Sequence, residues 1–135
     1  MRIMTPTEAA YVAGIIDGEG SIEFKRRPRI RRDRIGTPTY VTLIVRMEVP
    51  QVDGRLIDYL METTKEGTRD MKHYPNNDSW QDQHRWRCGY HAVYRILKQV
   101  HRYLIVKKEK SKQVIDHYDK QFKKKTYGKG GFGTK

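Results

Sequence analysis

The stretch Tyr11-Val-Ala-Gly-Ile-Ile-Asp-Gly-Glu-Gly-Ser21 occurs once in the chain and decides its fold. Ala10, Gly14 and Gly18 are spaced four apart, so on a helix they form a row of small residues that lets another helix approach closely. Asp17 and Glu19 follow where the flanking glycines favour the end of that helix. A close helix contact therefore carries two carboxylates at its own end, and carboxylates are ligands for hard cations.

The composition of the chain indicates a polyanionic partner. At 135 residues it fits one domain with a real core. Lys and Arg outnumber Asp and Glu by 28 to 16, a formal net charge of +12, which favours nucleic acid. An anionic membrane surface is the rival partner, but the sequence has no long apolar stretch and no basic amphipathic N-terminal anchor. We therefore expect no membrane association.

The single cysteine and the N-terminal sequence bear on the compartment. Cys88 has no cysteine to pair with, so an intrachain disulfide and a cysteine zinc site are excluded. The N-terminus lacks an apolar signal region and an evident transit peptide. We expect an intracellular protein that works where it is made, in a bacterial cytoplasm or in the organelle that encodes it.

Apolar periodicity predicts an α+β domain over residues 1–122, with the order αββαββα and a further helix at its end. The pattern Thr5-Pro6-Thr7-Glu8 is typical of a helix start. We expect helices over 6–17, 51–62, 91–104 and 107–122, and strands over 21–27, 40–48, 68–74 and 83–90. The basic tail over 123–135, rich in Gly and Lys, cannot bury enough apolar surface to order itself and is expected to be disordered.

Residues 12–20 resemble the name-giving signature of the LAGLIDADG homing endonucleases, with Val for Leu at its first position, Gly for Ala at its seventh and Glu for Asp at its eighth. In that family the acidic eighth position is the metal-binding catalytic residue. The resemblance thus implies this role for Glu19, with the Gly18 carbonyl beside it and Mg²⁺ or Mn²⁺ as the cofactor. Taken alone, the motif has an alternative interpretation as a core helix with a Gly-rich C-cap and a solvated acid.

Strand alternation predicts a four-stranded antiparallel sheet with one polar, basic face. Basic side chains on that face can reach phosphates or guanine edges, and the resemblance implies that the strand positions after the motif read bases. The expected DNA-binding residues are Glu23, Lys25, Arg27, Tyr40, Thr42, Arg46 and Arg69. The alternative is the solvated face of a basic protein. The basic run over 25–34 is interpreted either as a hairpin extension that grips phosphates or as a flexible loop.

One motif in one chain implies a second subunit. Breaking both DNA strands needs two cleavage centres, so we expect an isologous homodimer in which the first helices pack across a two-fold axis. The expected interface residues are Ala10, Ala13, Gly14 and Asp17. The matching partner is double-stranded DNA with a long, roughly palindromic target.

The remaining catalytic candidates come from the resemblance. Lys107 follows an apolar run as the family's active-site lysine does, and such a lysine can polarise water or stabilise developing charge. Gln51 and Arg55 match the polar positions between the second strand and the second helix, although another alignment puts Val49 and Asp53 there. The resemblance implies an intron-encoded, site-specific DNA endonuclease. The alternative is an intron maturase that binds its own intron RNA, or a DNA- or RNA-binding protein that does not cleave.

Overall fold

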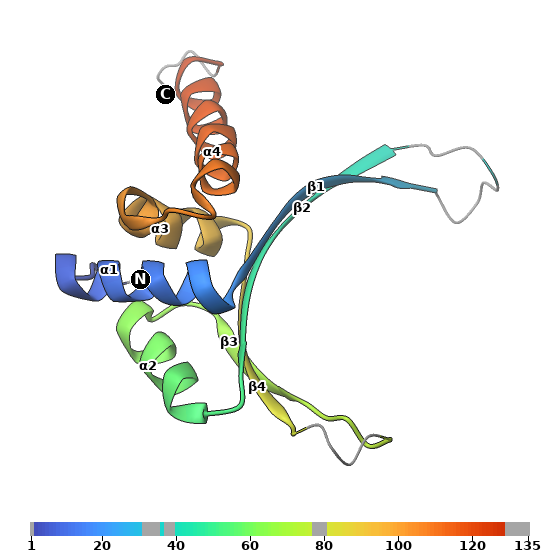
Figure 1. Cartoon of the computed structure of the whole chain (residues 1–135). Coiled ribbons are helices and arrows are strands. Elements are labelled where there is room, and N and C mark those ends of the chain that lie inside the picture. The colour runs from blue at the N-terminus through green and yellow to red at the C-terminus, as the bar shows by residue number, and fades with distance from the viewer. Residues whose placement is uncertain (1, 31–35, 37–39, 77–80, 129–135) are drawn as a thin grey trace.

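A computed structural model describes residues 2–30, 36, 40–76 and 81–128 as one four-stranded antiparallel sheet with helices packed on one face (Figure 1). The strands lie in the order β1-β2-β4-β3, with bounds β1 Ser21–Arg29, β2 Tyr40–Gln51, β3 Thr68–Lys72 and β4 Gln83–Gly89. The helices are α1 Pro6–Glu19, α2 Gly54–Thr64, α3 His91–Val100 and α4 Lys108–Gly128, with a 3-10 turn at His101–Tyr103 before α4. The predicted α+β class, element order and antiparallel sheet are confirmed.

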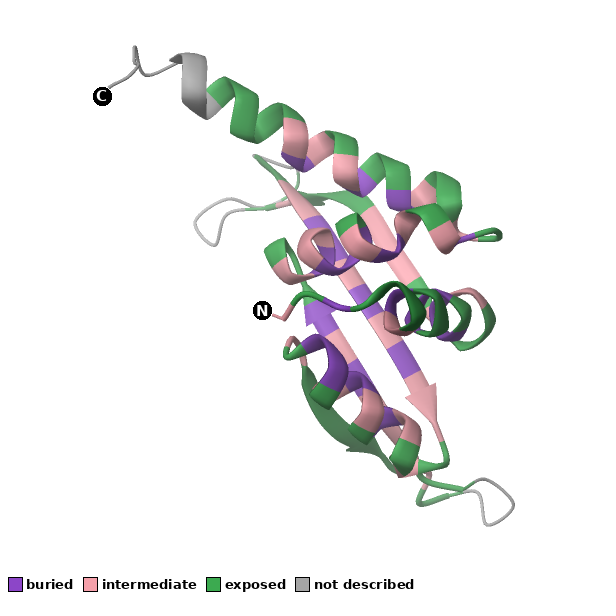
Figure 2. Cartoon of the chain, turned by 90° about the vertical axis from the view of Figure 1, so that its left-hand side faces the viewer, coloured by how far each residue is buried: buried purple, intermediate pink, exposed green. Residues whose placement is uncertain are grey.

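The core lies between the sheet and the helices (Figure 2). Alternate residues of the central strand β2 point into it, and α1, α2 and α3 each contribute one apolar face. The largest fully buried side chains are Trp86, Ile16, Met47, Ile57, Leu60, Ile96, Leu97 and Leu104. None of the helices in the described part of the chain combines the length and apolar composition needed to cross a membrane.

Pro28 and Pro50 lie beyond the predicted ends of the strands over 21–27 and 40–48, but the structure places both inside strands. Pro28 belongs to β1, an edge strand with a single partner, so its missing N–H costs no second ladder bond. Pro50 belongs to β2. The pairing of β2 with β1 ends at Glu48, which lies opposite Ser21, so at Pro50 only β4 lies alongside. The helix α2 therefore begins later than expected, with Asp53 as its N-cap.

The sheet bends so that its helix-free face is concave, and α4 projects away from the body on the helix side (Figure 1). The helix α4 continues past the predicted end at residue 122 to Gly128, so the first part of the segment that was expected to be disordered is helical. Residues 129–135 lie outside the described residues, as do residues 31–35 of the basic run.

Candidate active site and nucleic-acid interface

Local sequence determines where α1 begins and ends. The Thr5 side chain accepts the Glu8 backbone N–H at 3.2 Å, and the Glu8 carboxylate accepts the Thr5 N–H at 2.9 Å, which closes a capping box. At the other end the N–H of Gly20 donates to the Ile16 carbonyl. A Cβ at Gly20 would lie 3.0 Å from backbone atoms of Ile16, so only glycine lets the chain leave the helix this closely and enter β1.

The Asp17 carboxylate joins the end of α1 to the loop before α4. It accepts the backbone N–H groups of Ile105 at 2.7 Å and Lys107 at 3.0 Å. Burial acts to raise the pKa of Asp17, but the N–H groups of Ile105, Lys107 and Val106 and the Lys107 charge act to lower it, and the net pKa is lowered. Asp17, which was expected at a dimer interface, thus has a defined contact within its own chain.

This contact brings Lys107 to the end of α1. The Lys107 ammonium donates to the Asp17 backbone carbonyl at 2.8 Å. Asp17 therefore holds both the backbone and the side chain of Lys107, although Asp17 and Lys107 are far apart in sequence. Lys107 and Glu19, two residues predicted to act together, come from separate elements that meet here.

Glu19 is the last residue of α1 and is exposed. Within the described part of the chain it forms no hydrogen bond or ion pair, in contrast to Asp17. Gly18 before it is also exposed. No cluster of three or more His, Cys, Asp or Glu side chains suited to a metal ion occurs among the described residues. What the chain offers a cation here is one free carboxylate and adjacent backbone carbonyls.

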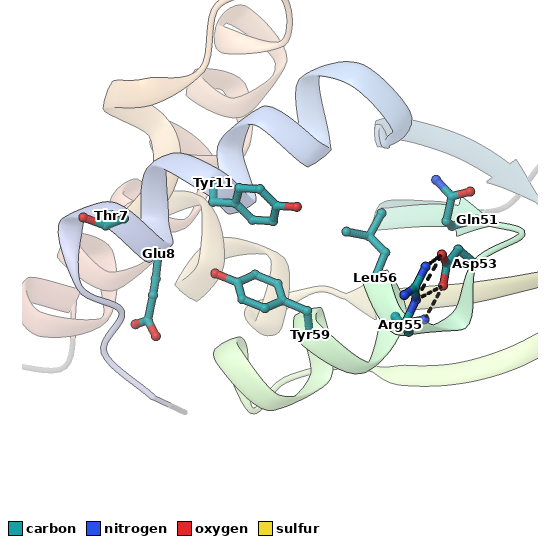
Figure 3. A pocket seen from close by; sticks show the side chains of 8 residues that line it. All are labelled: Thr7, Glu8, Tyr11, Gln51, Asp53, Arg55, Leu56 and Tyr59. Carbon is teal, nitrogen blue, oxygen red and sulfur yellow. Dashed lines mark hydrogen bonds and ion pairs between the residues drawn. The ribbon is translucent and has the colours of Figure 1, made fainter.

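Gln51 and Arg55 border an open pocket of about 840 Å³ between α1 and α2 (Figure 3). Arg55 is 89% exposed and pairs with the α2 N-cap Asp53 at 2.6 Å, and the Arg55 hydrogen bonds lower the Asp53 pKa to about 2. Gln51 accepts the N–H of Val52. Val49, offered by the alternative alignment, is fully buried and cannot contact a ligand. Asp53 remains accessible beside Arg55.

The concave face of the sheet carries most of the predicted DNA-binding residues. Glu23 lies opposite Arg46 and Arg27 lies opposite Thr42 in the β1–β2 register, so these side chains share one face with Lys25 and Tyr40. Glu23 pairs with Arg46 at 2.6 Å and with Lys25 at 2.7 Å. The outward alternation expected for β1 and β2 is therefore present.

The prediction for Arg69 is wrong. Arg69 lies opposite Trp86, whose side chain is fully buried beneath the helices, so Arg69 points to the helix side of the sheet. There it pairs with Asp58 of α2 and contacts His84 Nδ1 at 3.1 Å. The Arg69 side chain therefore cannot contact a ligand on the concave face.

Two arginines of β4 take the place that sequence reasoning gave to Arg69. Arg85 lies opposite Asp70, and Arg87 lies opposite Glu48 on the other neighbouring strand, so both belong to the concave face. The sequence held a signal for them, because Trp86 and Cys88 alternate with them and both are apolar.

The two sides of α1 differ in what they contact. Ala10, Gly14 and Gly18 are exposed, and a Cβ added at Gly14 or Gly18 would meet no atom within 4 Å. Ala13 is fully buried in the core and has no surface to offer, which corrects its prediction as an interface residue. The residues at 10, 14 and 18 form one open row along the helix.

The curved four-stranded antiparallel sheet with helices on one face has the fold of the LAGLIDADG homing endonucleases. I-CvuI in complex with its DNA target in the presence of calcium superposes with a TM-score of 0.62 at 18% identity, over 82% of this chain and 65% of that one. For the archaeal intron-encoded I-Vdi141I complexed with DNA, the values are 0.59, 17%, 82% and 65%. For I-SmaMI bound to an uncleaved DNA target with calcium, they are 0.61, 15%, 93% and 40%.

No protein-family model and no curated protein sequence matches the chain. The chain covers 65% of the length of both the I-CvuI and the I-Vdi141I chains, which is less than two thirds. At identities of 15 to 18% the likeness establishes the fold, and the predicted resemblance is confirmed at that level.

Proposed function

We propose that this protein is a homing endonuclease that binds double-stranded DNA along its concave sheet and hydrolyses phosphodiester bonds with a divalent metal ion. The observation that carries the proposal is that one end of α1 carries both an unpaired carboxylate, Glu19, and a lysine fixed in place, Lys107. Glu19 has no partner in the described part of the chain, whereas Lys107 is held at the same end of α1 by Asp17, two residues before Glu19. An exposed, unpaired carboxylate at the helix end that also holds a lysine is suited to chemistry on a phosphate.

The metal would be held by the Glu19 carboxylate together with the Gly18 carbonyl, DNA phosphates and water. Mg²⁺ accepts such a site, because it keeps several waters and needs few protein carboxylates. A bound divalent ion activates water and neutralises charge on the scissile phosphate. Asp17 is the poorer candidate ligand, because a cation on its oxygens would compete with the backbone N–H groups and the Lys107 ammonium that they already accept.

The residues of the chain have separate tasks in this proposal. The Lys107 ammonium contributes positive charge beside the reacting phosphate, where it stabilises the negative charge that develops. Asp17 holds the Lys107 backbone and so keeps the ammonium in place. Arg55 and Gln51, at the border of the neighbouring pocket, are candidates to bind phosphate and orient water, and Arg55 must leave Asp53 to do so.

The active enzyme is proposed to be a homodimer formed through α1. A glycine inside a helix costs about 1 kcal/mol relative to alanine, and packing within the chain gives no reason for glycine at 14 or 18. Close approach of a second α1 along the row at Ala10, Gly14 and Gly18 supplies that reason. Two-fold symmetry then places two Glu19 carboxylates near each other and favours a roughly palindromic target.

The test is Glu19→Gln, assayed on the DNA formed by joining the sequences that flank the reading frame, with Mg²⁺ or Mn²⁺. We expect the wild type to cut both strands and Glu19→Gln to bind the same DNA without cutting it. Glu109→Gln, an exposed acid in the first turn of α4, is the matched control and should cut like the wild type. Cleavage by Glu19→Gln would refute the catalytic assignment, and a wild type that binds but never cuts would favour a non-cleaving binder.

A further inference from the structure

The concave face mixes acids with its cations, although a surface built only to hold DNA would carry cations alone. The strand registers place seven basic and three acidic residues on the described part of this face. The basic ones are Lys25, Arg27, Arg29, Arg46, Lys72, Arg85 and Arg87, and the acidic ones are Glu23, Glu48 and Asp70.

Each acid on this face lies between two cations. Glu23 accepts from Arg46 at 2.6 and 2.9 Å and pairs with Lys25 at 2.7 Å. Across the sheet, Asp70 pairs with Arg85 at 2.8 Å and with Arg87 at 3.3 Å. These hydrogen bonds lower the pKa of Glu23 to about 2 and lower that of Asp70, so both acids stay charged at working pH.

Glu48 lies on the central strand between the same two arginines, 3.9 Å from Arg85 and 3.8 Å from Arg87. Each described arginine in the middle of the face, namely Arg46, Arg85 and Arg87, therefore pairs with a carboxylate. Further out along the β1–β2 hairpin, Arg27 and Arg29 form no ion pair with any described residue. Among the described residues of this face, charge compensation is therefore found at the centre.

Stability does not explain these pairs. The Glu23 and Arg46 side chains are 31% and 43% exposed, and exposed ion pairs typically contribute about 0 to 1 kcal/mol. Their effect on a polyanion is larger. An arginine already neutralised by a carboxylate gains less from a phosphate, and only the guanidinium N–H groups that the carboxylate leaves free are available to a base edge.

We propose that Glu23 and Asp70 are specificity-determining residues. Because they pair with the central arginines of the concave face, they weaken the non-specific binding of these arginines to phosphates, and we call arginines paired in this way guarded. This inference rests on the proposed function, in that the groove binds duplex DNA. Arg27 and Arg29, which are unguarded among the described residues, bind phosphates at the hairpin independently of sequence. The guarded Arg46, Arg85 and Arg87 contact DNA only where base contacts and DNA shape compensate for the weakening of their ion pairs with Glu23 and Asp70.

The test uses a random-sequence duplex of about three helical turns and measures affinity as a function of salt. Glu23→Gln and Asp70→Asn should each bind this duplex roughly three- to tenfold more tightly near 0.1 M salt, with a salt slope steeper by about one to two. Glu62→Gln and Asp58→Asn are matched controls, because each removes an acid of α2 that pairs with one cation and lies away from the concave face. The controls change net charge equally, so we expect only small gains from them.

A second pair of variants compares a guarded and an unguarded arginine of the same hairpin. Arg27→Gln should weaken binding to the random duplex and lower the salt slope by about one, whereas Arg46→Gln should change both less. Equal losses for the two arginines, or equal gains for acid variants and controls, would overturn the guarding role alone. A wild type with no duplex binding even at low salt would overturn the proposed function together with it.

Discussion

Asp17→Ala should both destabilise the chain and release Lys107. The substitution leaves the N–H groups of Ile105 and Lys107 without the carboxylate that accepts them at 2.7 and 3.0 Å. A hydrogen bond to a charged group contributes about 1.5 to 3 kcal/mol. Ile105 is 83% exposed, so water can replace its partner and the low end applies there. We expect a total loss of about 3 to 4.5 kcal/mol in the free energy of unfolding, with about 1.5 kcal/mol from the Ile105 bond and the rest from the Lys107 bond.

Urea denaturation at neutral pH measures this loss. Asp17→Asn should lose about half as much, because the amide oxygen still accepts one N–H and its nitrogen cannot accept the other. Asp116→Ala is the matched control, since it removes an exposed aspartate whose pair with Lys112 is worth about 0.3 to 0.5 kcal/mol. A loss below about 0.5 kcal/mol for Asp17→Ala, equal to the control, would refute the reasoning.

The same contact has a pH signature. The folded-state pKa of Asp17 is lowered, so its contribution to stability is complete above the unfolded pKa of about 3.9 and is lost as the pH falls through the folded pKa. Asp17→Asn has no proton to bind and should lose less stability between neutral pH and the acid range than the wild type. Identical acid profiles for the two proteins would show that the carboxylate is not the stabilising form.

Three further substitutions test other contacts. Gly14→Leu should leave the fold intact, because nothing lies within 4 Å of an added Cβ, but should halve the mass found by sedimentation; a variant that stays dimeric would contradict packing through α1. Lys107→Ala should slow cleavage about 10²-fold and leave the DNA affinity within a factor of two, so an equal fall in both would contradict a catalytic role. Gly67→Ala should cost about 2 to 4 kcal/mol in urea denaturation, since φ is +85° and the Cβ would lie 2.7 Å from Cys88 Sγ; a cost below about 1 kcal/mol would show that the loop adjusts.

Much of the fold was predictable because its signals are local. The alternation in β2 and the apolar spacing in α2 and α3 are each complete within one element, and each matches the burial that the structure shows. The ends of the elements were less predictable. They depend on neighbours, as at Pro50, where pairing with β4 alone lets β2 continue.

The error at Arg69 has a physical cause. Every residue of β3 is exposed, so this strand carries no apolar alternation from which its orientation could be read. Its facing is determined by pairing with β4, which places Asp70 opposite Arg85 and Arg69 opposite Trp86. Counting outward from the buried Trp86 would have assigned both strands.

The contact between Asp17 and the loop at Lys107 could not be derived from spacing, because it joins residues that are 90 positions apart. It nonetheless supports, from contacts within the chain, the choice of Glu19 over Asp17 that the resemblance implies. Each oxygen of the Asp17 carboxylate already accepts a backbone N–H group, so a cation bound there would compete with the contacts that hold the Lys107 loop. Glu19 breaks nothing when it binds. The acid that holds the Lys107 loop and the acid proposed to bind the metal are therefore different residues, and the contacts of Asp17 distinguish them.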